Sequence, residues 1–170
     1  MLANNRGGCL ADLGLLDEAL VAFDEALTFR LRPYLAGRPE LDADLAMLMS
    51  NRGNCLSDLG RFQQALASYD DALVLHRRPH LAERRDLDAD RAMQVMNRGN
   101  CLSRLDRFNE AMAAYDDALV LHNLPHLVGR PGLDATRALM AMNRGSCLWG
   151  LGHLDEALAA YDAALAYWAA

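Results

Sequence analysis

The sequence repeats itself at a fixed interval of 46 residues, and such an interval constrains the architecture before any single motif does. Asn-Arg-Gly occurs four times, at residues 5–7, 51–53, 97–99 and 143–145. The four cysteines keep the same step: Cys9, Cys55, Cys101 and Cys147. Segments 47–92 and 93–138 share 30 identities over 46 aligned positions. We therefore predict a single repeat domain over 1–170, with copies at 1–46, 47–92, 93–138 and a short 139–170.

Each copy is predicted to form two amphipathic helices. In the second copy, apolar residues recur every three or four positions, first over 42–59 and then over 62–76. Gly60 lies where glycine commonly ends a helix, and 77–85 is a proline-containing loop with room for one helical turn. We expect Asp42 to cap the start of the first helix.

A glycine recurs inside the first helix of every copy, as at Gly53. Glycine there costs about 1 kcal/mol relative to alanine, so its recurrence indicates a compensating close approach of the paired helix. The facing residues are expected to be small, namely Ala65 and Ala72. One such hairpin cannot bury its outer faces alone, and stacking of successive hairpins produces a solenoid.

The second copy resembles the tetratricopeptide repeat (TPR) pattern at residues 51–56, 59–62, Ala65, Tyr69 and 72–73. The resemblance implies an all-α fold, a right-handed α-solenoid of helix-turn-helix repeats. It also implies a non-enzymatic module that binds a peptide or protein segment in its concave groove. The usual unit is about 34 residues, so each copy carries about 12 more. We assign the surplus to the loop and to a longer first helix.

The same resemblance places peptide-contacting residues on the first helices. Lys and Ile are absent from the sequence, which indicates a GC-rich coding bias that should deplete Asn as well. Asn is also a mediocre helix former, yet it gathers around Asn-Arg-Gly, and its amide both donates and accepts hydrogen bonds. Peptide binding is the preferred interpretation, and hydrogen bonding between adjacent hairpins is the alternative. The residues assigned to peptide binding are Asn5, Asn51, Asn54, Ser57, Asn97, Asn100, Arg104, Asn143 and Trp149.

Several methionines are placed on the same groove by the resemblance, among them Met47, Met93, Met96 and Met142. Methionine suits adaptable binding surfaces, and Trp149 is a candidate aromatic anchor. Plain core packing is the alternative for each methionine.

Other function classes find little support. The net charge of −6 argues against nucleic acid or an anionic membrane as the main partner. No apolar run or leader-like start is evident, so a cytoplasmic protein is expected. We find no catalytic residue set and predict neither enzyme activity nor a cofactor. A proline interrupts each of two histidine pairs, so no metal site is predicted at His76 with His80 or at His122 with His126. The cysteines are expected to be buried packing residues without disulfides.

Each copy also pairs an arginine of Asn-Arg-Gly with an aspartate of the second helix, as Arg52 and Asp70 illustrate. We predict that the arginine reaches the aspartate of its own or a neighbouring hairpin, separate solvated charges being the alternative.

The chain ends on Tyr167-Trp168-Ala169-Ala170, an apolar stretch where solenoids usually carry a polar cap. Either the chain is a piece of a longer array or its ends associate with another copy. We predict a homo-oligomer formed through the terminal hairpins, with Trp168 near the contact. The alternative function is therefore a structural self-assembly module.

Overall fold

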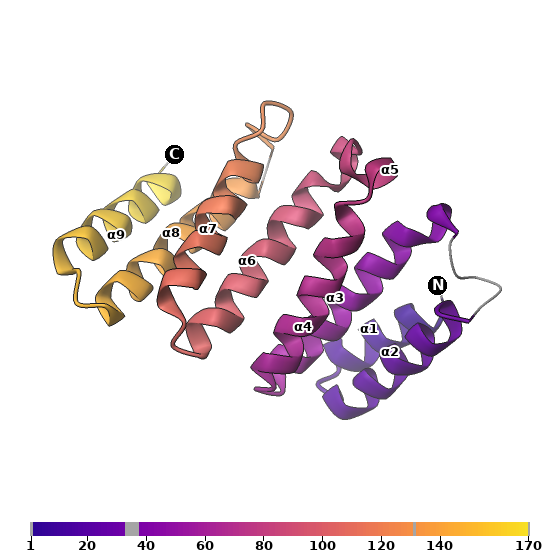
Figure 1. The fold of residues 1–170 in the computed structure, drawn as a ribbon. Helices are drawn as coiled ribbons and strands as arrows, with labels where there is room; N and C mark the ends of the chain where they lie inside the picture. The colour runs from indigo at the N-terminus through magenta and orange to yellow at the C-terminus, as the bar shows by residue number, and fades with distance from the viewer. Residues whose placement is uncertain (1, 33–37, 131, 170) are drawn as a thin grey trace. The chain divides into compact units, whose positions relative to one another are not determined.

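The computed structural model describes residues 2–32, 38–130 and 132–169, and within these ranges the chain forms helices and no strands (Figure 1). The predicted all-α fold class is confirmed. The α-helices are α1 (Leu2–Asp12), α2 (Leu16–Arg30), α3 (Asp42–Asp58), α4 (Phe62–His76), α5 (Pro79–Ala82), α6 (Asp88–Arg104), α7 (Phe108–His122), α8 (Leu133–Gly150) and α9 (Leu154–Ala169). Two short 3-10 helices, η1 (Pro39–Leu41) and η2 (Arg85–Leu87), precede α3 and α6.

The helices group into two compact units, Met1–Arg84 and Arg85–Ala170. The first unit holds the hairpins α1–α2 and α3–α4, and the second holds α6–α7 and α8–α9 (Figure 1). Within each unit the second helix of one hairpin packs on the first helix of the next, α2 on α3 and α7 on α8. The first helices also touch, α1 with α3 and α6 with α8.

Left-handed residues end the first helices as the sequence predicts. Gly60 follows α3 with φ of +72°, and Gly14 and Gly152 adopt similar values after α1 and α8. The third copy has Asp106 at this position, and it takes the same turn with φ of +57°. A side chain is strained there, so the turn geometry overrides the residue preference.

The helix-interior glycines permit a close approach, but the side chain that meets each glycine is an aromatic ring rather than a small residue. A Cβ built on Gly53 would lie 2.7 Å from Cε1 of Tyr69, and one on Gly7 would lie 2.5 Å from Cε1 of Phe23. The aromatic ring of the second helix therefore occupies the space that a side chain at the glycine position would take. Alanines such as Ala65 are fully buried, and their small size allows the two helices to approach.

Asp42 does not cap α3 in the expected way, because it is the first helical residue and makes no capping bond. Its buried carboxylate lies 2.7 Å from Nη1 of Arg78 and 2.9 Å from Nε2 of His80. In the second unit, His126 Nε2 lies 3.1 Å from Oδ2 of Asp88. Asp42 thus holds the loop after α4 onto the start of α3, and Asp88 holds the loop after α7 onto the start of α6.

The cysteines are free thiols, and three of the four, Cys55, Cys101 and Cys147, are buried as predicted. Cys9 is exposed, so the prediction is wrong for this residue. Cys55 Sγ donates to the carbonyl oxygen of Leu16 at 3.0 Å, and burial raises the pKa of the Cys55 thiol. Cys9 lies on α1, and no hairpin covers its outer side in the described part of the chain.

Candidate functional site

The asparagines of the first helices bond to one another within each unit. Asn51 Nδ2 on α3 donates to Oδ1 of Asn4 on α1 at 3.1 Å. Asn143 Nδ2 on α8 donates to Oδ1 of Asn100 on α6 at 2.9 Å. These amide pairs join neighbouring hairpins, which is the alternative role that the sequence left open. Peptide binding by the same residues stays a prediction.

A tyrosine of the second helix bonds to the first helix of its own hairpin. Tyr69 donates from its hydroxyl to Oδ1 of Asn54 at 2.6 Å, and Tyr115 donates to Oδ1 of Asn100 at 2.9 Å. The Tyr115 ring is buried, and burial raises the pKa of its hydroxyl above the ordinary value. Asn100 therefore accepts from both Tyr115 and Asn143, which fixes the orientation of its amide group.

The hydroxyl and its partner occur together across the copies. The fourth copy places Tyr161 3.2 Å from Ser146, oxygen to oxygen. The first copy has Phe23 instead of a tyrosine, and the equivalent first-helix residue is Gly8, which offers no side-chain acceptor. The partner on the first helix is thus present where the ring carries a hydroxyl.

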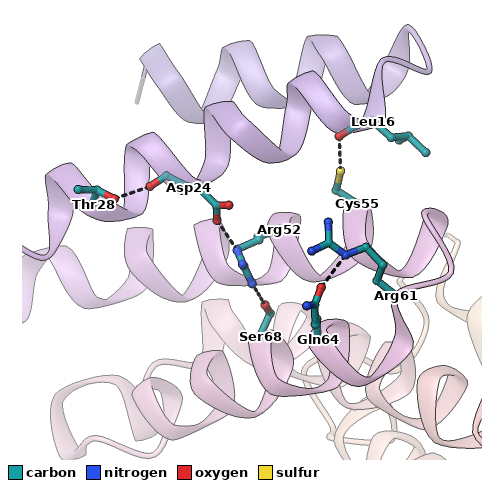
Figure 2. A network of polar contacts seen from close by, with 8 residues as sticks. All are labelled: Leu16, Asp24, Thr28, Arg52, Cys55, Arg61, Gln64 and Ser68. Carbon is teal, nitrogen blue, oxygen red and sulfur yellow. Dashed lines mark hydrogen bonds and ion pairs between the residues drawn. The ribbon is translucent and has the colours of Figure 1, made fainter.

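Arg52 joins three helices (Figure 2). Its Nε donates to Oδ1 of Asp24 on α2 at 2.6 Å, and its Nη1 donates to Oγ of buried Ser68 on α4 at 2.7 Å. Arg144 repeats the first contact on Asp116 of α7 at 3.1 Å. The predicted arginine–aspartate pairing is confirmed at these two junctions, and the aspartate belongs to the preceding hairpin.

Several large apolar side chains are exposed on the first helices. Trp149 is 66% exposed, and Met142 and Leu139 are also exposed on α8. Spacings of three and seven residues place these three side chains on one helical face. Met93 is exposed at the α6 position equivalent to Leu139, whereas Met96 is buried in the core. The expectation that Met96 lines the binding face is therefore wrong. We call Leu139, Met142 and Trp149, together with Asn143, the α8 face.

The remaining predicted site residues also lie on first helices. Asn5 is exposed on α1, Ser57 is half-buried on α3, and Asn97 is half-buried on α6. Arg104 is exposed at the end of α6. The structure thus brings the predicted set onto one class of helix, with Trp149 the most prominent exposed apolar member.

Sequence reasoning missed the burial of Arg137. Arg137 is 4% exposed, and its guanidinium pairs with Asp134 and donates from Nη2 to the carbonyl oxygen of His122. Burial, assisted by the positive charge of Arg137, lowers the pKa of the His122 ring.

Within residues 2–32, 38–130 and 132–169, no group of three or more His, Cys, Asp or Glu residues is placed to hold a metal ion. The described helices also contain no segment with the length and apolar character that a bilayer crossing requires.

Comparison with protein families identifies two models, both described as tetratricopeptide repeat. One matches residues 45–78, and the other matches 95–120 and 138–167. Together these ranges cover more than half of the chain. A search among proteins of curated function finds no match.

Solved structures share the fold at low sequence identity. BtubC (BKLC) from P. vanneervenii aligns with a TM-score of 0.80 at 20% identity over 98% of this chain, which spans 62% of that protein. MamA aligns with a TM-score of 0.68 at 17% identity over 97% of this chain and 75% of its own. The TPR2AB domain of yeast Sti1, solved as a complex with pHSP90, gives 0.55 at 14% identity over 97% of this chain and 76% of its own.

Proposed function

Because the chain belongs to the tetratricopeptide repeat family, a family of protein-interaction modules, we propose that it binds an extended segment of a partner protein on its first helices. The proposed role is that of a non-enzymatic scaffold. The proposal is supported by the exposed apolar residues and amides that share these helices. It is also supported by the Sti1 neighbour, which was solved with pHSP90 bound.

The exposure of Trp149 is the observation that carries the proposal. A solvent-exposed tryptophan on the same helical face as Met142 provides a large apolar contact with few torsions to fix, and such residues dominate the energetics of interfaces. Methionine adapts its shape to the segment that it contacts. The α8 face therefore suits a segment that places an apolar or aromatic side chain against Trp149.

The amide of Asn143 supplies the polar half of the site. An amide has two donor hydrogens and an acceptor oxygen with two lone pairs, so its bond to Asn100 leaves capacity for a peptide backbone.

Asn54 is a less suitable test position than its exposure indicates. Its oxygen accepts the Tyr69 hydroxyl, so an Asn54→Ala variant would lose stability for reasons unrelated to binding.

The test is selection from a displayed random peptide library, followed by fluorescence titration of the selected peptides. A Trp168→Phe background leaves Trp149 as the single tryptophan reporter. We expect saturable changes in Trp149 emission. Trp149→Ala and Met142→Ser, assayed by calorimetry, should each weaken binding at least tenfold. Val120→Ser, which changes an exposed side chain of α7, should not weaken it. Peptides that bind equally to wild type and both α8-face variants would overturn the proposal.

A second candidate function is self-assembly through the terminal hairpins. One observation favours it: Leu158 and Leu165 of α9 are 61% and 67% exposed. Two exposed leucines on one helix face support this proposal, because an apolar face of this kind is stabilised when a neighbouring hairpin covers it. The Trp168 side chain, expected near this contact, lies outside the described residues.

A further inference from the structure

The outer face of α9 has the residues of an internal junction without its neighbour. Leu20 of α2 is only 7% exposed, because α3 packs over it, whereas the equivalent Leu158 of α9 is 61% exposed. Leu27 is half-buried on α2, and its equivalent Leu165 is 67% exposed. The described chain contains no hairpin that covers α9.

The outer face of α1 shows the complementary half of the same junction. Leu56 of α3 is fully buried and Cys55 is 1% exposed, with its thiol against the Leu16 carbonyl of α2. The equivalents on α1 are Cys9, which is exposed, and Leu10, which is half-buried. The side of α1 that corresponds to the covered side of α3 is therefore open.

The charged pair that marks the α2–α3 and α7–α8 junctions has its two equivalents on α1 and α9. At the described junctions an arginine of the incoming first helix reaches an aspartate of the preceding second helix, as Arg52 reaches Asp24. The equivalents are Arg6 on α1 and Asp162 on α9, and both are exposed. Among the described residues, Arg6 makes a long contact of 3.8 Å with Glu25, and both side chains are mostly exposed.

We propose that α9 of one copy receives α1 of a second copy as its next first helix, so that copies associate head to tail. Arg6 of the incoming copy pairs with Asp162, Leu10 packs on Leu158, and Cys9 becomes buried near Leu154. The partner is a second copy of this chain because the same chain carries both halves of the junction, with opposite charges at the matched positions. The interface is heterologous, so each association leaves a free α1 and a free α9.

This inference rests on the second candidate function, self-assembly, and it specifies the two surfaces and their register. Sedimentation velocity over a concentration series tests it with two charge-reversed variants, Arg6→Asp and Asp162→Arg. Each variant alone places like charges at the junction, so we expect association to weaken about tenfold relative to wild type. An equimolar mixture restores an opposite pair at every junction, so we expect its association to return to the wild-type level.

Two further variants separate the possible failures. Leu158→Ser alters a side chain that is exposed in the single copy, so it should abolish association without unfolding the chain. Val120→Ser, which alters an exposed side chain of α7, is the control and should have no effect. The Cys9 thiol should react with a disulfide reagent in dilute protein and become protected as association proceeds. A chain that stays monomeric at every concentration overturns both self-assembly and this inference. Association that ignores the charge reversals and Leu158→Ser overturns the inference alone.

Discussion

Arg52 on α3 donates from its Nε to the carboxylate of Asp24 on α2 across 2.6 Å, and thus joins two successive hairpins. The aspartate is half exposed, whereas the second partner of the guanidinium, Ser68, is buried. The contact recurs one unit further along, where Arg144 meets Asp116. A guanidinium shared between hairpins fixes how one lies on the next, and this specificity matters more than its small net stabilisation.

Removal of Arg52 should destabilise the protein more than removal of Arg144. Both arginines make the junction pair, but only Arg52 also donates to a buried hydroxyl, since the residue equivalent to Ser68 in the hairpin of Arg144 is Ala160. We expect Arg52→Ala to lower the free energy of unfolding by about 1–2 kcal/mol, and Arg144→Ala by less than about 1 kcal/mol. Urea denaturation measures both. In a Ser68→Ala background the two effects should become equal, and a persistent difference would refute this account.

Gly53→Ala and Gly8→Ala should change stability in opposite directions. A Cβ on Gly53 would meet the Tyr69 ring at 2.7 Å, whereas a Cβ on Gly8 meets nothing within 4 Å. Overpacking at Gly53 should destabilise by about 1–3 kcal/mol. Alanine at Gly8 improves helix propensity and should stabilise by up to about 1 kcal/mol. Thermal denaturation followed by circular dichroism distinguishes the two, and equal shifts in Tm would contradict the packing of the ring over the glycine.

Tyr69→Phe should remove one hydrogen bond without creating a cavity. The hydroxyl donates to Asn54 at 2.6 Å, and its ring is 1% exposed, so we expect a loss of about 0.5–1.5 kcal/mol in the free energy of unfolding. Tyr161→Phe is the matched control. Its hydroxyl contacts Ser146 at 3.2 Å in an exposed setting, where water replaces the bond, so its change should be smaller. An equal or larger effect at Tyr161 would refute the assignment of the Tyr69 effect to its buried hydrogen bond.

His122→Leu should flatten the dependence of stability on pH. Burial, with Arg137 nearby, holds the pKa of His122 below its ordinary value of 6.5. The unfolded state therefore binds this proton first as the pH falls below about 6.5, and the wild type loses stability by up to about 1.4 kcal/mol per pH unit there. The contribution is fully present above the unfolded pKa.

Urea denaturation at pH 7.5, 6.5 and 5.5 measures the slope for wild type and His122→Leu, and the other histidines are common to both. We expect the variant to lose less stability on acidification. Parallel curves would show that His122 takes up its proton equally readily in the folded and unfolded states.

The hairpins follow directly from local signals in the sequence. Apolar spacing over 42–59 predicts a helix that the structure places at Asp42–Asp58, and Gly60 marks its end with a left-handed turn. Because the sequence repeats every 46 residues, a correct prediction of one hairpin applies to all four copies. The one-turn helix α5 also lies within the loop where the sequence allowed it.

The hydrogen-bond and ion-pair partners of polar residues are harder to predict from the sequence. Asp42 has the position and chemistry of a helix cap, but it bonds to Arg78 and His80, which come from more than thirty residues further along the chain. The repeat pattern includes Tyr69, but it does not show that this ring occupies the space over Gly53. Spacing along one helix does not report which side chain of another helix arrives at a given point.

The sequence by itself determined the period, the helical hairpins, the turns between them and the family, because these depend on contacts only a few residues apart that recur at a fixed step. Tertiary structure alone decided that Asn143 bonds to Asn100, that Met96 is core while Trp149 is exposed, and that Cys9 is open while Cys55 is covered. These outcomes depend on which hairpin lies beside a residue, and residues of identical type at equivalent positions differ in environment where that neighbour is missing.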